Sequence, residues 1–249
     1  MFIDKHIHLN DDRYQEELDQ VIEEALKENV KLMFVIGYNK KSSIKAVEIA
    51  NKYDNCYALV GIHPSDAKSE TDCSFIYDLC KNKKVVGIGE IGLDYYWDRS
   101  YDEIQKEVFI KQLKIANELN LPISVHAREA TQETFDIIKQ YKPKGIIHCY
   151  SGSVEIAREY IKMGLYIGVG GVVTFKNSKV LKNVVSDISL DYIVTETDGP
   201  YLAPTPYRGK TNYPKYIPLI ASEIATIKNV TIEEVEKTIE SNVKRLFNI

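Results

Sequence analysis

Short apolar runs that end in a histidine or an acidic residue recur along the whole chain. Histidines close three of these runs and acidic residues close two, over residues 2–8, 85–90, 122–126, 145–148 and 192–198. Runs of this length that are rich in β-branched residues predict strands buried on both faces. A polar residue at the tip of one parallel strand after another predicts a barrel with a site at one mouth.

Helical patterns alternate with these strands. Helices are predicted over about 14–26, from about 42, and over 104–119, 134–141 and 154–163, and further strands over 31–37, 57–61 and 165–168. Near the C-terminus, Thr231 and Glu234 form a capping box that predicts the start of a last helix. Eight strands with helices between them predict a single α/β domain over 1–249, a (β/α)8 barrel of the TIM-barrel type.

The composition excludes some classes of protein. With 44% hydrophobic and 27% charged residues, the chain is an ordinary globular protein. No apolar run approaches the roughly 18 residues of a membrane span, and Met1 leads directly into the first strand, so we expect no signal peptide and a cytoplasmic location. A net charge of −4 argues against a broad basic surface for long nucleic acid. A phosphodiesterase remains compatible, because metal ions can supply positive charge locally.

The four cysteines predict no disulfide framework. Cys56, Cys73, Cys80 and Cys149 show no C-x-x-C spacing, and we expect reduced thiols. A thiol nucleophile at Cys149 is an alternative, but its neighbours resemble metal ligands rather than a base with its orienting group.

The first strand carries two histidines at alternate positions. Side chains two residues apart point to the same face of a strand, so His6 and His8 are expected to project together into the mouth. Asp4 is expected to orient one imidazole from below, and Lys5 to point away. Alone, the pair fits a divalent metal site and a metal-free strand end equally well.

Four further polar residues favour the metal interpretation. The six candidate ligands, at the tips of five strands, are His6, His8, Glu90, His126, His148 and Asp198. A set of nitrogen and oxygen ligands suits zinc, manganese or magnesium, and Glu90 has two oxygens with which to bridge two ions. Glu90 and Asp198 are the predicted catalytic residues, with Asp198 also accepting a proton from water.

Five sequence blocks resemble the signatures of the TatD family, the metal-dependent deoxyribonucleases of the amidohydrolase superfamily. The blocks are HIH at 6–8, GIHP at 61–64, GEIGLDY at 89–95, HCYSG at 148–152 and ETDGPYL at 196–202. The resemblance covers the whole chain and implies a distorted TIM barrel with two divalent ions, Mg, Mn or Zn. One ion would be held by His6, His8, Glu90 and Asp198, and the other by Glu90, His126 and His148.

The resemblance also implies an activity, which is trimming of single-stranded DNA from the 3′ end. Removal of D-amino acids from transfer RNA is the alternative that the family offers. The chain departs from the family pattern at Lys5, where relatives usually carry a small hydroxyl residue, and at Gly199, often serine. In the late loop, Thr211 and Tyr213 stand where arginine and glutamate are common. These departures leave the ligands intact and bear on substrate preference.

Two long strand-to-helix loops, 94–99 and 199–210, lie on the face that carries the ligands, where substrate contacts are expected. Arg208 and Lys210 are predicted phosphate contacts, although basic loop residues are often merely solvated. Tyr95, Tyr96 and Trp97 are predicted stacking partners for nucleobases, with packing at the barrel top as the competing interpretation for at least one of the three. His63 is either a substrate contact at the rim or a histidine held in a turn.

Three functions fit the sequence. The first is a phosphodiesterase whose partner is the end of a single-stranded DNA or another nucleic acid, consistent with the absence of any helix-turn-helix or basic arm. The second is hydrolysis of a carboxylic ester or amide, including an aminoacyl ester on RNA. The third is a barrel that binds a nucleotide or partner without turnover, against which six intact ligands weigh. Metal identity and oligomeric state stay open at this stage.

Overall fold

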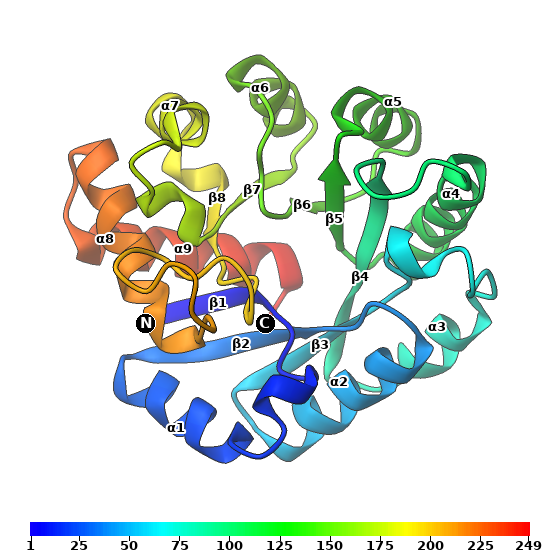
Figure 1. Cartoon of the computed structure of the whole chain (residues 1–249), viewed down its shortest axis with the longest axis horizontal. Helices are drawn as coiled ribbons and strands as arrows, with labels where there is room; N and C mark the ends of the chain where they lie inside the picture. The colour runs from blue at the N-terminus through cyan, green and yellow to red at the C-terminus, as the bar shows by residue number, and fades with distance from the viewer.

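The computed structural model describes residues 1–249 as eight parallel strands surrounded by helices (Figure 1). The strands are hydrogen-bonded in chain order, which confirms the predicted barrel. They are β1 (Phe2–Ile7), β2 (Val30–Ile36), β3 (Cys56–Val60), β4 (Val85–Asp94), β5 (Ile123–Arg128), β6 (Gly145–Ile147), β7 (Tyr166–Val169) and β8 (Ile193–Thr195).

Nine α-helices connect and follow these strands. They are α1 (Leu18–Lys27), α2 (Lys40–Lys52), α3 (Ser74–Leu79), α4 (Asp102–Leu119), α5 (Thr131–Tyr141), α6 (Val154–Lys162), α7 (Lys179–Asp187), α8 (Ile217–Lys228) and α9 (Ile232–Phe247). Helices α3, α7 and α8 lie outside the predicted ranges. Thr231 caps α9 as expected, with its hydroxyl accepting from the Glu234 amide at 3.2 Å. No helix combines the length and apolar character needed to span a membrane.

The barrel is not fully closed. Strands β8 and β1 form no ladder, although the Thr195 hydroxyl donates to the Ile3 carbonyl at 2.9 Å. An isolated bridge joins Ile7 to Gly199, which lies beyond the end of β8. Two backbone hydrogen bonds hold this seam: the Asp198 amide donates to the His6 carbonyl at 2.9 Å, and the His8 amide donates to the Gly199 carbonyl at 2.8 Å. Asp198 therefore enters the mouth from a loop, since β8 ends at Thr195.

Irregular register in two strands shapes the mouth. Strand β4 does not end at Glu90 but runs on to Asp94. Between the pairs Ile88–Ile123 and Ile91–Val125, two residues of β4 face one residue of β5. Strand β1 has a similar irregularity between Asp4 and Ile7. An extra residue of this kind breaks the alternation of faces and re-aims side chains.

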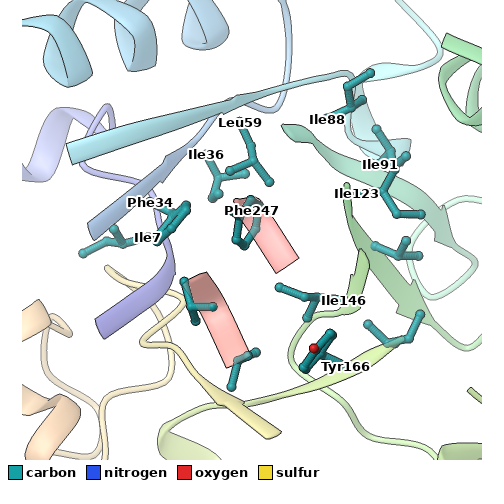
Figure 2. Close-up of a cluster of buried hydrophobic side chains, with 14 of the residues drawn as sticks. Ile7, Phe34, Ile36, Leu59, Ile88, Ile91, Ile123, Ile146, Tyr166 and Phe247 are labelled. Atoms are coloured by element: carbon teal, nitrogen blue, oxygen red, sulfur yellow. The ribbon is translucent and has the colours of Figure 1, made fainter. Parts of the chain in front are cut away.

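The opposite end of the barrel is apolar and closed by α9. Phe247, the last residue of that helix, lies within the cluster of buried side chains drawn in Figure 2, with its ring centroid 4.7 Å from that of Phe34. Ile123 and Tyr166, the first residues of β5 and β7, belong to the same buried cluster. The barrel is therefore packed at the end where its strands begin, which leaves the other end for chemistry.

Candidate metal centre

The structure brings all six candidate ligands to the mouth formed by the carboxyl ends of the strands, around Glu90. Glu90 Oε2 lies 3.5 Å from Nε2 of both His6 and His8. Glu90 Oε1 lies 2.9 Å from His126 Nδ1 and 3.1 Å from His148 Nε2. The two oxygens of one buried carboxylate thus face two separate pairs of imidazoles.

Asp198 completes the group around His6 and His8. Its Oδ1 lies 3.9 Å from His6 Nε2 and 3.7 Å from His8 Nε2. His6 Nε2 is buried and has no hydrogen-bond partner, although two carboxylates lie near it. An imidazole nitrogen left unpaired among carboxylate oxygens fits a divalent cation, since buried polar atoms are otherwise satisfied.

The imidazoles of His6, His8 and His126 are hydrogen-bonded from behind through their other nitrogen, while that of His148 faces a carboxylate without a hydrogen bond. The pairs are His6 Nδ1 with Ser124 Oγ at 3.1 Å, His8 Nδ1 with the Ile36 carbonyl at 3.1 Å, His126 Nε2 with Asp94 Oδ2 at 3.0 Å and His148 Nδ1 with Glu196 Oε1 at 3.4 Å. Such partners fix the ring orientation of metal-binding histidines. Sequence reasoning missed these roles. Asp94 and Glu196 stand in the family-like blocks, but Ser124 carries no such signal.

Asp4 does not orient an imidazole, so that prediction is wrong. Its carboxylate accepts from the Thr197 amide at 2.9 Å and from the Thr197 hydroxyl at 2.5 Å, and it also receives the His6 amide at 3.3 Å. Burial raises the pKa of Asp4 to about 7, against the lowering effect of these hydrogen bonds. Asp4 therefore ties the loop that carries Asp198 to strand β1.

Lys5 points into the barrel, contrary to the prediction. Its side chain is fully buried, and its Nζ donates to Ser124 Oγ at 2.6 Å and lies 4.0 Å from Glu196 Oε2. The reason is the irregularity in β1, which places Lys5 and His6 against the same serine. Burial lowers the pKa of Lys5 to about 8, although Glu196 favours its charge.

His63 joins the cluster from the loop after β3. Its Nδ1 accepts from the Ser65 amide at 3.1 Å, so its Nε2 carries the proton when the ring is neutral. That Nε2 lies 3.5 Å from Glu90 Oε1. Burial lowers the pKa of His63 to about 3, which keeps the ring neutral. His63 is therefore held in a turn through Nδ1 and also lies at the rim, where its Nε2 presents a hydrogen-bond donor to the mouth.

The charges of the centre are arranged to receive cations. Burial raises the pKa of Asp198 to about 6. Burial opposes the charge on His148, but Glu90 and Glu196 outweigh it and raise the pKa of that imidazole to about 10. Protonated imidazole thus balances the buried carboxylates in the metal-free protein, and metal binding would release such protons.

A cavity of about 590 Å³ opens above this centre. Its lining includes His63 but none of Tyr95, Arg208 and Lys210. Tyr95 is buried and donates its hydroxyl to Glu133 at 2.6 Å, while the Arg208 guanidinium lies 4.5 Å from the ring centroid of Phe175. Their role in substrate binding stays a prediction that this geometry does not support.

Cys149 does not have the surroundings of a nucleophile. Burial raises the pKa of its thiol well above the usual value, and the nearby carboxylates of Asp198 and Glu196 add to this effect. Its backbone amide donates to Glu196, the carboxylate that faces His148. The contribution of Cys149 to the centre is therefore structural.

Comparisons with known proteins agree with this geometry. A family model described as TatD related DNase matches residues 3–248. An uncharacterized metal-dependent hydrolase of Bacillus subtilis is 45% identical over the full length of both chains, and one of Methanocaldococcus jannaschii is 40% identical over 99% of this chain and 96% of its own.

Solved structures show the same fold. A TatD homologue from Escherichia coli superposes with a TM-score of 0.94 at 25% identity, covering 100% of this chain and 98% of the other. An organophosphorus hydrolase from Deinococcus radiodurans superposes with a TM-score of 0.69 at 12% identity, covering 99% and 92%, and shows the barrel fold alone.

Proposed function

We propose that this chain, which belongs to the TatD family of metal-dependent hydrolases, cleaves phosphodiester bonds at the 3′ end of single-stranded DNA. The observation that carries the proposal is the division of the Glu90 carboxylate between two pairs of histidines. A carboxylate shared in this way suits two neighbouring divalent ions, the arrangement common in enzymes that hydrolyse phosphate esters.

The residues divide into two ligand sets that share Glu90. His6, His8 and Asp198 would hold one ion with Glu90, and His126 and His148 the other. Bound Mg, Mn or Zn would supply Lewis acidity to the phosphoryl oxygens and lower the pKa of coordinated water.

The side chains at the cavity would carry out the remaining steps. Asp198 faces the cavity and would accept the proton of the attacking water. His63 would donate its Nε2 proton as a hydrogen bond to a phosphoryl oxygen, because its other nitrogen is already an acceptor. The donor would thereby stabilise charge that develops on the phosphate.

Three observations support a nucleic acid substrate, and the first two favour an end of the chain over an internal site in a duplex. The cavity of about 590 Å³ is the size of a small ligand pocket. The net charge of −4 does not favour a broad contact with the phosphates of a duplex. The matching family model is described as a DNase.

The test is an assay with 5′-labelled single-stranded DNA, chelator-stripped protein, and magnesium, manganese or zinc added back. We expect a ladder that shortens from the 3′ end, depends on metal and is absent in Glu90→Gln. No cleavage with any metal would contradict the proposal. Turnover of an aminoacylated RNA by the same reloaded protein would then favour the alternative, a metal-dependent ester or amide hydrolase such as a D-aminoacyl-tRNA deacylase.

A further inference from the structure

The most exposed large apolar side chain of the protein stands at the edge of the metal centre. Trp97 is 74% exposed, lies in the loop between β4 and α4, and lines the same cavity as Glu90 and Asp198. It is also the only tryptophan of the chain. A large aromatic ring kept in solvent at the mouth of a site is a contact surface, since it gains from burial only when a ligand covers it.

The ring of Trp97 is braced on one side. Tyr96 meets it edge to face, with centroids 4.7 Å apart and an interplanar angle of 89°. The Arg128 guanidinium lies 3.7 Å from the Tyr96 centroid and 5.4 Å from that of Trp97. These contacts limit the freedom of the loop, so less order has to be gained when a ligand binds.

Arg128 is an unpaired cation at the same cavity. It forms no ion pair and no side-chain hydrogen bond, whereas Arg13, Arg99, Arg158 and Arg245 each bond to an oxygen of the protein. Arg208, which also has no polar partner, does not line this cavity. Arg128 lies two residues beyond His126 on β5, so both side chains rise on the same side of that strand. Five unused donors beside a phosphodiesterase centre suit a phosphate.

We infer that Trp97 and Arg128 form a nucleotide-binding pair, in which an unpaired base stacks on the indole and its phosphate binds the guanidinium. This inference rests on the proposed function and sharpens it. It assigns the substrate as a chain with exposed bases, because a base within a duplex presents no face to the indole. An isolated phosphodiester would use only Arg128, and a simple carboxylic ester would use neither residue.

Tyr201 offers a second aromatic surface across the cavity. It is 50% exposed, its ring centroid is 6.5 Å from that of His8, and the Arg13 guanidinium lies 4.5 Å from its ring centroid. Arg13 is already paired with Asp11 in two hydrogen bonds. Arg128 is therefore the cation at this mouth that is free for phosphate.

The single tryptophan makes the inference directly measurable. Whole protein is titrated with a phosphorothioate-linked hexathymidylate, which resists cleavage, with and without manganese, while the fluorescence of Trp97 is followed. An abasic oligomer of equal length is the matched ligand control. We expect saturable quenching by the thymidylate and none by the abasic chain. Equal responses to both, or no saturable response in either metal condition, would overturn the inference.

Two variants separate the members of the pair. Arg128→Gln is expected to weaken hexathymidylate binding about tenfold and to reduce the slope of log Kd against log salt by about 0.7, the value for one phosphate contact on a single strand. Arg158→Gln, which removes an equal charge on α6, is expected to leave both unchanged. Identical slopes in the two variants would overturn the phosphate contact.

Trp97→Ala is expected to raise KM for the cleavable oligomer about fivefold to a hundredfold, with little change in kcat and no change on the abasic substrate. DNA cleavage with an unchanged KM in this variant would overturn the inference and leave the proposed function standing. Base-specific quenching without DNA cleavage would support the nucleotide-binding pair and contradict the proposed function.

Discussion

The two ends of the barrel differ in how their side chains meet the strands. At the closed end, apolar residues such as Phe34 and Phe247 pack in the buried cluster of Figure 2. At the open end, both strands that supply His6 and Glu90 have irregular register, and Asp198 has a left-handed backbone with φ of 56°. Regular packing therefore holds the fold together, while the departures from regularity orient the polar groups.

The sharpest test of this division is Asp198→Asn. We expect turnover to fall by about 10² to 10⁴, the range for loss of a general base, because an amide cannot accept the proton. The free energy of unfolding of the metal-free protein should stay within about 1 kcal/mol, because burial raises the pKa of this carboxyl and its charge does not stabilise the fold. Single-turnover rates and urea unfolding in chelator measure the two quantities. A large loss of unfolding free energy would show that the polar end also holds the fold together.

Phe247→Ala should show the opposite behaviour. Removing a buried ring from the closed end is expected to cost about 3–5 kcal/mol of unfolding free energy, from lost burial and the cavity left behind. Metal stoichiometry at low temperature should be unchanged. Urea unfolding and metal titration on the same sample give the answer. Loss of metal with little loss of stability would mean that the ends are not independent.

Lys5→Met tests the buried cation beside the candidate metal centre. Removing a positive charge near Glu196 and Ser124 is expected to tighten binding of a divalent ion about tenfold, since like charges repel strongly at low dielectric. Lys182→Met, which removes a charge paired with Glu223 on the outer helices, is the control. Isothermal titration with manganese measures both. Weaker binding in Lys5→Met would show that the ammonium supports the centre instead of opposing it.

Much of the fold could be predicted, because strands buried on both faces leave continuous apolar runs and their tips mark one mouth. The site could be predicted only where a residue ends such a run. Lys5 was misplaced because counting alternate residues cannot reveal the extra residue in β1. Ser124 was missed because its partners His6 and Lys5 are distant in sequence. Arg128 gave no signal, since the absence of a partner is visible only in three dimensions.

The most direct test of the account is the number of manganese ions bound per chain by chelator-stripped protein, measured for the unaltered chain and for Glu90→Gln. We expect two ions for the unaltered chain, and no more than one tight ion when an amide replaces the shared carboxylate. Two ions bound with equal affinity in both proteins would contradict the bridging role of Glu90 and with it the two-metal centre.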